Sequence, residues 1–194
     1  MLKFAICGNI ASGKSTVERI LTEKGYKVFD TDKISHEILN NCKNKIIETF
    51  KEFDIIDNNE ISRKKLGDLV FNNIELKKNL ENIIYPELRL ELEQIFKNNS
   101  SEKFIFISIP LLYEVGWENL FDKILFVKAD DDIRLKRLML RNNLSKEDAL
   151  KRIRSQLPQE EKLKKSDFII CNNGDIINLQ KEIEEFIILL EDME

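Results

Sequence analysis

The sequence predicts an α/β protein in which helices flank a five-stranded parallel sheet on both faces. Five short apolar segments alternate with segments of helical periodicity. The first of them runs into a glycine-rich turn and then a helix, and residues 35–99 contain no convincing strand. A chain of 194 residues with 42 % hydrophobic content can bury a sizeable core, so we expect one globular domain with a helical excursion after the second strand.

The expected strands are continuous apolar runs, which is typical of parallel strands buried on both faces. The first run stops at Gly8 and the third at Pro110, and both residue types commonly interrupt regular structure. Helical segments fill the intervals, so successive strands should run parallel. We expect strands at residues 2–7, 26–29, 103–109, 123–128 and 167–171.

Capping and proline signals set the expected helix boundaries. The first helix starts near Lys14, and Gly25 is its expected stop. Pro86 is expected to begin a helix, because proline suits the first helical position. Residues 145–148 (S-K-E-D) match a capping box at the start of another helix.

Composition argues against several classes of partner. The net charge of -4 gives no electrostatic footprint for nucleic acid. The sequence has no run of about eighteen apolar residues, so no membrane span is predicted, and the N-terminus lacks a signal-peptide pattern. Three scattered cysteines give neither metal-ligand spacing nor a disulfide framework, which favours a reducing cytoplasm. We therefore expect a cytoplasmic monomer or weak homo-oligomer whose partner is a small molecule, without nucleic acid or membrane.

Residues 8–15 (G-N-I-A-S-G-K-S) fit the phosphate-binding pattern G-x-x-x-x-G-K-[ST] at every fixed position. Such a loop wraps its backbone N–H groups around a phosphate, and the following helix points its N-terminal dipole at the same anion. Lys14 should reach the β- and γ-phosphates of ATP, and the Ser15 hydroxyl should bind Mg²⁺. A chance match in a surface loop is the alternative, but the strand before the motif and the helix after it favour the site. The expected nucleotide-binding residues of this loop are Gly8, Ala11, Ser12, Gly13, Lys14, Ser15 and Thr16.

Two aspartates follow the second strand, and ligands of doubly wound sheets bind at the carboxyl ends of strands. Asp32 is our candidate for the general base that accepts the proton of an attacking hydroxyl, and Asp30 could orient it or belong to the metal shell. Alternatively, one of the pair caps the following helix. Capping by one aspartate leaves catalysis by the other open.

Three arginines, Arg134, Arg137 and Arg141, are spaced to share one helix face. A solvated basic face is the ordinary interpretation. However, a short loop and a second capped helix follow, and such a helix–loop–helix could close over ATP as a lid. An arginine there would neutralise the transferring phosphoryl group and exclude water. We favour Arg141, which is nearest the loop, then Arg137, with Arg154 a weaker candidate.

Together these motifs resemble the dephospho-coenzyme A kinase family over nearly the whole chain. The P-loop is common to many nucleotide-binding proteins, whereas D-T-D, P-L-L-Y-E and N-N-G in this order are much more specific. The resemblance rests on the P-loop, D-T-D with K-I-S-H-E, R-K-K-L-G-D-L-V-F, I-P-L-L-Y-E, R-L-M-L-R, Q-L-P-Q-E-E-K and S-D-F-I-I-C-N-N-G.

The resemblance implies ATP-dependent phosphorylation of the ribose 3′-hydroxyl of dephospho-CoA, the last step of CoA synthesis, with Mg²⁺. It implies a nucleotide-binding core (1–34, 100–130 and 160–194), a helical acceptor-binding domain (35–99) and a lid (131–159). By similarity, Asp32 is the base, Arg141 the lid arginine, and Asn172 lies near the adenine. The implied acceptor contacts are Asp32 to His36 with Pro110, Leu111 and Leu112. From the residues alone, His36 is simply a histidine on a helix surface.

The chain departs from the family pattern at three positions. Tyr85 stands where the family usually has a histidine that contacts the acceptor, and Asn142 where it has aspartate. Ala11 replaces a usual glycine, which is tolerable if its φ is negative.

Two other functions fit parts of the sequence. Another small-molecule or nucleoside monophosphate kinase could share the core with a different acceptor site. A regulatory NTPase is less compatible, because such proteins often have a hydrophobic run ending in a metal-binding aspartate. Here the third strand ends in Ser108-Ile109-Pro110.

Overall fold

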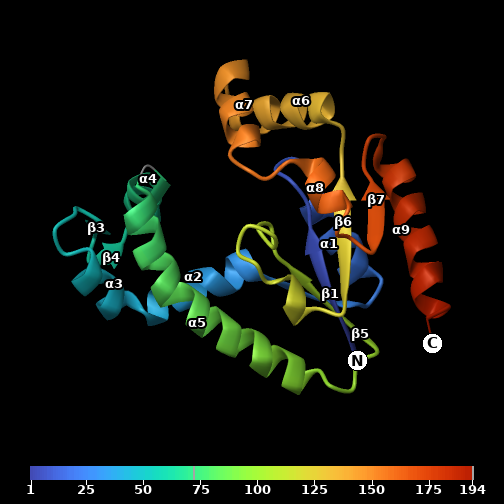
Figure 1. Ribbon diagram of the computed structural model, residues 1–194, viewed down its shortest axis with the longest axis horizontal. Coiled ribbons are helices and arrows are strands. Elements are labelled where there is room, and N and C mark those ends of the chain that lie inside the picture. The colour runs from blue at the N-terminus through green and yellow to red at the C-terminus, as the bar shows by residue number, and fades with distance from the viewer. Residues whose placement is uncertain (72, 194) are drawn as a thin grey trace. The chain divides into compact units, whose positions relative to one another are not determined.

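The computed structural model describes residues 1–71 and 73–193, and these form two compact units (Figure 1). The sheet unit comprises Met1–Asp30 and Ser101–Glu194, and the helical unit comprises Thr31–Ser100. The polypeptide enters the helical unit at Thr31 and returns to the sheet unit at Ser101. The insertion is therefore continuous in sequence.

The sheet unit contains a five-stranded sheet in the order β2-β5-β1-β6-β7, in which every neighbouring pair is parallel. This confirms the predicted fold class. The register aligns Ile6, Ser108 and Asp30 across β1, β5 and β2, so these three strands end at the same edge. The strands are β1 (Leu2–Cys7), β2 (Lys27–Asp30), β5 (Phe104–Ser108), β6 (Lys123–Lys128) and β7 (Phe168–Cys171).

One face of the sheet packs against α1 (Lys14–Glu23) and α9 (Ile176–Glu191), which also contact each other (Figure 1). The core there is rich in phenylalanine. Phe4 and Phe106 lie 5.1 Å apart between ring centroids, and Phe186 of α9 packs edge-on against both. Burial contributes about 1.5–3 kcal/mol for each apolar side chain, so this face fixes the positions of β1 and α1 on either side of the turn that joins them.

The helical unit is built around one long helix, α5 (Ile74–Asn98). The expected helix start at Pro86 is wrong, because this proline lies inside α5. The helix begins instead at Ile74 and is capped by Asn73, whose side chain accepts hydrogen bonds from the N–H groups of Glu75 (3.0 Å) and Leu76 (3.1 Å). Buried residues continue on both sides of Pro86, and this burial outweighs the one backbone hydrogen bond that the proline removes.

The helices α2 (Thr31–Asn41), α3 (Lys43–Thr49) and α4 (Arg63–Phe71) pack on α5. The unit also contains a small hairpin, β3 (Ile56–Asp57) and β4 (Glu60–Ile61), which the sequence prediction missed. Asn58 and Asn59 have φ values of 47° and 63°, as a two-residue turn of this kind requires. Strands of two residues are too short to produce an apolar pattern.

The sheet unit also carries the expected helix–loop–helix, formed by α6 (Asp131–Asn142) and α7 (Lys146–Arg154). Asn143 ends α6 with a φ of 49°, and Ser145 Oγ accepts a hydrogen bond from the Asp148 N–H at 3.1 Å. The predicted cap is thus confirmed. A single turn, η1 (Glu118–Leu120), and the short helix α8 (Gln159–Leu163) complete the unit. No helix within the described residues is long and apolar enough to cross a bilayer.

Candidate nucleotide site

The turn between β1 and α1 leaves no room for side chains at its two glycines. A Cβ at Gly8 would lie 2.6 Å from Ser12 Oγ and 2.7 Å from the Val127 carbonyl oxygen. Gly13, with a φ of 93°, caps α1, and a Cβ there would collide with the Asn172 amide. The glycines of the motif are therefore required by close approach as well as by backbone conformation.

Ala11 adopts a φ of 63°, so the condition of a negative φ under which alanine would be tolerated without strain is not met. An L-residue in this left-handed region is strained by about 1–2 kcal/mol, because its Cβ approaches the following carbonyl oxygen. The neighbouring residue explains how the conformation persists. The Ile10 N–H donates to Gln156 Oε1 at 2.7 Å, which fixes the loop beside Ala11.

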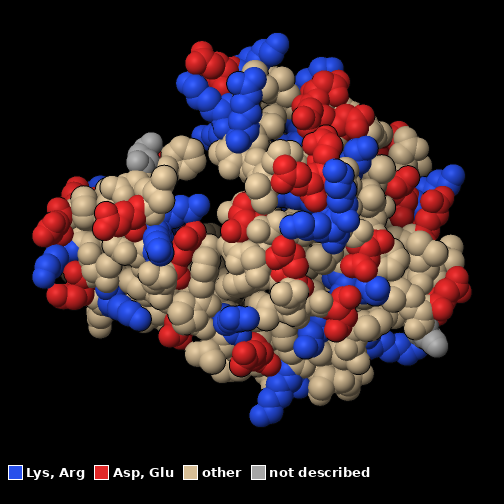
Figure 2. Space-filling model, in the orientation of Figure 1, with Lys and Arg blue, Asp and Glu red and all other residues tan. Residues whose placement is uncertain are grey.

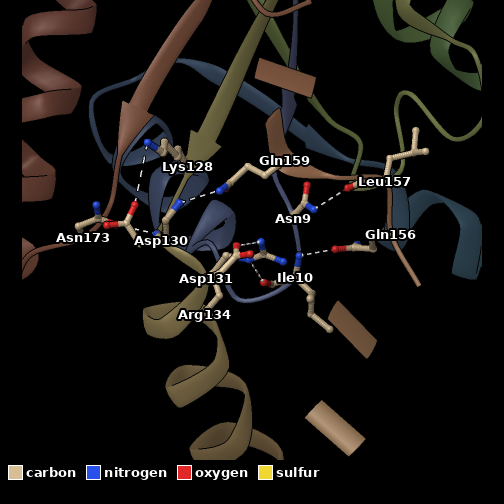
Figure 3. Close-up of polar contacts among 11 residues, drawn as sticks. Asn9, Ile10, Lys128, Asp130, Asp131, Arg134, Gln156, Leu157, Gln159 and Asn173 are labelled. Carbon is tan, nitrogen blue, oxygen red and sulfur yellow. Dashed lines mark hydrogen bonds and ion pairs between the residues drawn. The ribbon is translucent and has the colours of Figure 1, made fainter. Parts of the chain in front are cut away.

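A segment far along the chain supports the outer side of the loop (Figure 3). The Asn9 side-chain amide donates to the Leu157 carbonyl at 3.0 Å, beside the bond from Ile10 to Gln156. Both acceptors belong to the Q-L-P-Q-E-E-K stretch that follows α7. This stretch therefore connects the base of the helix–loop–helix directly to the phosphate-binding loop.

Arg134 forms a second support, also visible in Figure 3. Only 1 % of Arg134 is exposed, and its Nε donates to the Ile10 carbonyl at 3.1 Å. Its Nη1 donates to Asp131 Oδ1 at 2.7 Å. Burial lowers the pKa of Arg134, and the nearby carboxylate of Asp131 opposes that shift. Sequence spacing placed this residue on a shared basic face, but its role in the structure is to hold the loop backbone.

The other two arginines of α6 lie in different surroundings. Arg137 is partly buried, and its Nη2 donates to Asn172 Oδ1 at 3.4 Å. Arg141 is exposed, and its Nε donates to Asn142 Oδ1 at 2.9 Å. On the face drawn in Figure 2, Lys and Arg gather over the α6–α7 pair with acidic residues among them. Arg137 thus points back to the loop, whereas Arg141 lies near the turn between the helices.

Asn172 ties the end of β7 to the loop, since its Nδ2 donates to the Ser12 carbonyl at 2.7 Å. Around this contact, several buried polar atoms have no hydrogen-bond partner within the described residues. They include Ser12 Oγ, Asn9 Oδ1 and Arg137 Nη1. An unsatisfied buried polar group costs about 1–3 kcal/mol, so the donors among these atoms fit an anionic ligand that accepts hydrogen bonds here.

The loop after β5 is held by an ion pair that the sequence analysis did not predict. Lys162 is buried, and its Nζ lies 2.6 Å from Glu114 Oε1, which also accepts from the Leu157 N–H at 3.3 Å. Among the expected acceptor contacts of this loop, Leu112 is completely buried, whereas Leu111 is 37 % exposed. Leu111 is therefore the leucine whose side chain a ligand can reach, and Pro110 precedes it.

The remaining predicted residues lie in the helical unit. Asp32 is exposed in the first turn of α2, and His36, also exposed, has its Nδ1 3.1 Å from Arg63 Nη1. The Tyr85 hydroxyl donates to Glu81 Oε1 at 3.0 Å. Burial, with the hydrogen bond to Glu81, raises the pKa of Tyr85 well above its usual value, so the phenol stays protonated at neutral pH.

A parallel sheet whose first strand leads through a G-x-x-x-x-G-K-S turn into the first helix places the chain in the P-loop class of nucleotide-binding proteins. A family model described as dephospho-CoA kinase matches residues 2–178. The chain belongs to the dephospho-CoA kinase family.

Individual relatives agree with this assignment. A dephospho-CoA kinase of Fusobacterium nucleatum is 40 % identical over 183 residues, which cover 93 % of this chain and 94 % of the relative. The structure of dephospho-CoA kinase from Campylobacter jejuni superposes with a TM-score of 0.75 at 39 % identity, covering 95 % and 94 % of the two chains. A crystal structure from Thermus thermophilus gives a TM-score of 0.84 at 34 % identity, with 97 % of each chain covered.

Replacing Ala11 with glycine should stabilise the protein by about 0.5–1 kcal/mol, because glycine adopts a positive φ without strain. Urea unfolding measures the change. The matched control is Ala149→Gly, since Ala149 is buried in α7 and the same chemical change should there cost about 1 kcal/mol. Destabilisation by both substitutions would contradict a strained Ala11.

Replacing Arg134 with alanine should lower the free energy of unfolding by about 2–4 kcal/mol, because it removes a buried side chain and leaves the Ile10 carbonyl without its partner. Lys136→Ala tests an exposed cation of the same helix, and its effect should stay within about 0.5 kcal/mol. Equal losses in the two variants, measured by urea unfolding, would mean that Arg134 does not support the loop.

Proposed function

We propose that the protein is a dephospho-CoA kinase that transfers the γ-phosphate of ATP to the ribose 3′-hydroxyl of dephospho-CoA and thereby forms coenzyme A. The family to which the chain belongs is a family of ATP-dependent kinases. The observation that carries the proposal for this chain is the turn from Gly8 to Gly13, where two buried donors, Ser12 Oγ and the nearby Arg137 Nη1, have no hydrogen-bond partner within the described residues. Such donors suit the oxygens of a polyphosphate.

In this proposal the loop and the start of α1 bind the nucleotide. The first-turn N–H groups of a helix have no intrahelical acceptor and attract an anion. Lys14 contributes a charge to the β- and γ-phosphates, Thr16 follows in the same turn, and Arg137 faces the loop from α6. Asn172 holds the Ser12 carbonyl and stands beside the nucleotide, near the adenine by family resemblance.

The residues present also fit a magnesium ion. Ser15 exposes its hydroxyl at the start of α1, and magnesium in nucleotide sites is typically held by few protein oxygens together with the phosphates. When bound, the ion would neutralise charge on the phosphates and polarise the γ-phosphoryl group. No cluster of three or more acidic, histidine or cysteine ligands occurs within residues 1–71 and 73–193, so a site built on the nucleotide is the form we propose.

On the acceptor side, Asp32 is the proposed general base for the 3′-hydroxyl proton, with Asp30 at the end of β2 as an orienting group. The proposed acceptor contacts are His36, Tyr85, Pro110 and Leu111. Because the single hydroxyl proton of Tyr85 is donated to Glu81, the phenol oxygen can accept a hydrogen bond from the substrate, and this is the role we assign to it in place of histidine.

The helix–loop–helix supplies the proposed lid. Arg141 at its tip would approach the transferring phosphoryl group when the lid closes, and closure would exclude water as a competing acceptor. Three free cysteines agree with a cytoplasmic enzyme, which we propose to be a monomer or weak homo-oligomer.

A coupled ADP-release assay tests the reaction. Dephospho-CoA should stimulate ADP release strongly, whereas adenosine, AMP and shikimate should not, because only the first presents the proposed acceptor hydroxyl together with its recognition groups.

Lys14→Ala should lower kcat/KM by about 10²–10³-fold through loss of phosphate stabilisation, with Lys24→Ala as an unaffected control. Full-rate ATP hydrolysis without any acceptor would indicate a regulatory NTPase instead.

Replacing Asp32 with asparagine should lower kcat by about 10²–10⁴-fold with a small change in KM, because the amide cannot accept the hydroxyl proton. Steady-state kinetics with dephospho-CoA measures both parameters. Asp57→Asn, in the hairpin of the same unit, should retain the wild-type values. If kcat of the Asp32 variant stays within a few-fold of wild type, another group is the base.

A further inference from the structure

The ammonium group of Lys14 contacts a carboxylate as well as facing the proposed phosphate site. Glu18, one turn further along α1, places its Oε1 2.6 Å from Lys14 Nζ. The same oxygen accepts a hydrogen bond from Ser108 Oγ at 2.7 Å, and Lys14 also contacts that hydroxyl. Only 13 % of the Glu18 side chain is exposed, and Ser108 is completely buried. The carboxylate is thus held in one place by two partners.

The location of this carboxylate is informative. Ser108 is the last residue of β5, and β5 neighbours β1, the strand that leads into the phosphate-binding turn. In P-loop nucleotide hydrolases an aspartate on a strand helps the P-loop hydroxyl to hold Mg²⁺. In this chain β5 ends in serine, and the carboxylate reaches the same strand end from helix α1.

Charge balance gives this arrangement a consequence for binding. Lys14 is the cation expected to meet the terminal phosphates, yet Glu18 already lies against it. Little water surrounds this carboxylate to screen it from an incoming polyphosphate, and like charges in such surroundings repel strongly. Two anions next to one ammonium require a further cation. A divalent metal ion bound with the nucleotide would supply that charge.

We propose that Glu18 is a positioning residue that makes nucleotide binding depend on a divalent cation. It fixes the ammonium group of Lys14 beside Ser108, disfavours nucleotide that arrives without metal, and contributes the acidic charge that the end of β5 lacks. This inference rests on the proposed nucleotide site, and it concerns the coupling between metal and nucleotide rather than the transfer reaction.

The coupling can be measured without turnover. A non-hydrolysable ATP analogue is titrated calorimetrically into the full chain without acceptor, once with excess Mg²⁺ and once with EDTA. The dissociation constant in EDTA divided by the dissociation constant in Mg²⁺ reports how strongly the metal and the nucleotide favour each other's binding. In Glu18→Gln this ratio should fall by at least about tenfold. In EDTA the analogue should bind more tightly, because the carboxylate no longer repels the polyphosphate. In Mg²⁺ it should bind more weakly, because the carboxylate no longer attracts the metal.

Matched variants separate charge from structure. Glu18→Ala should lower the ratio as Glu18→Gln does, whereas Glu18→Asp retains the charge and should stay within about threefold of wild type. Glu23→Gln is the control on the same helix, because Glu23 pairs with Arg19 at 2.6 Å on an exposed surface. Its ratio should not change.

The possible results are distinct. An unchanged ratio in both neutral variants would overturn the inference, and so would equal weakening in Mg²⁺ and in EDTA, which would show that Glu18 only supports Lys14. A wild-type protein that binds the analogue under neither condition would refute the nucleotide site itself.

Discussion

The close approach of backbone in the turn from Gly8 to Gly13 is the constraint on which the rest of the structure depends. At Gly8 the Val127 carbonyl and the Ser12 hydroxyl occupy the space that a Cβ would need, and at Gly13 the Asn172 amide does so. These neighbours come from β6, the loop itself and the end of β7. The parallel sheet is what brings those strand ends together, because parallel strands terminate at a common edge. The apolar cluster under α1 and α9 therefore serves the site by keeping that edge in register.

The loop is held mainly by side chains that are far away in sequence. Arg134 and Gln156 bind the two backbone groups of Ile10, and Asn172 binds the carbonyl of Ser12. Two of these supports belong to α6 and to the segment after α7. That segment is fastened in turn by the ion pair between the buried Lys162 and Glu114. The helix–loop–helix and the turn between β1 and α1 are therefore joined by hydrogen bonds from α6 and from the segment after α7.

The sequence predicted what local patterns encode. The five strands, the turn, the cap at Ser145 and the order of elements follow from apolar runs, glycine spacing and capping residues. Apart from the two-residue strands of the hairpin, which are too short to give a pattern, the misses arise from tertiary packing. Continuous burial carries α5 through Pro86, and the bond from Ile10 to Gln156 fixes the loop beside Ala11, which keeps a positive φ. Arg134 differs from Arg141 only in its neighbours, and spacing along a helix does not reveal neighbours from another element. The i, i+3 spacing of Asp131 and Arg134, which form an ion pair, was the one local signal that set Arg134 apart from the other arginines.

Some lysine and arginine side chains pair with groups of the protein itself and others are proposed to meet the ligand. This division explains how an acidic chain could bind an anion. The net charge is -4, so anion binding has to come from where individual cations stand. Arg134 and Lys162 are buried and are bound to the Ile10 carbonyl and to Glu114, although Arg134 Nη2 has no hydrogen-bond partner within the described residues. In the proposed site, Lys14, Arg137 and Arg141 are the cations that meet the phosphates. Of these, Lys14 is already balanced by Glu18, and Arg137 has a buried nitrogen without a partner among the described residues. In the proposed site, the pairing of Lys14 with Glu18 would disfavour a polyphosphate without metal, and the unpartnered Arg137 nitrogen would favour it. A metal ion accompanying the nucleotide would then shift the balance toward binding.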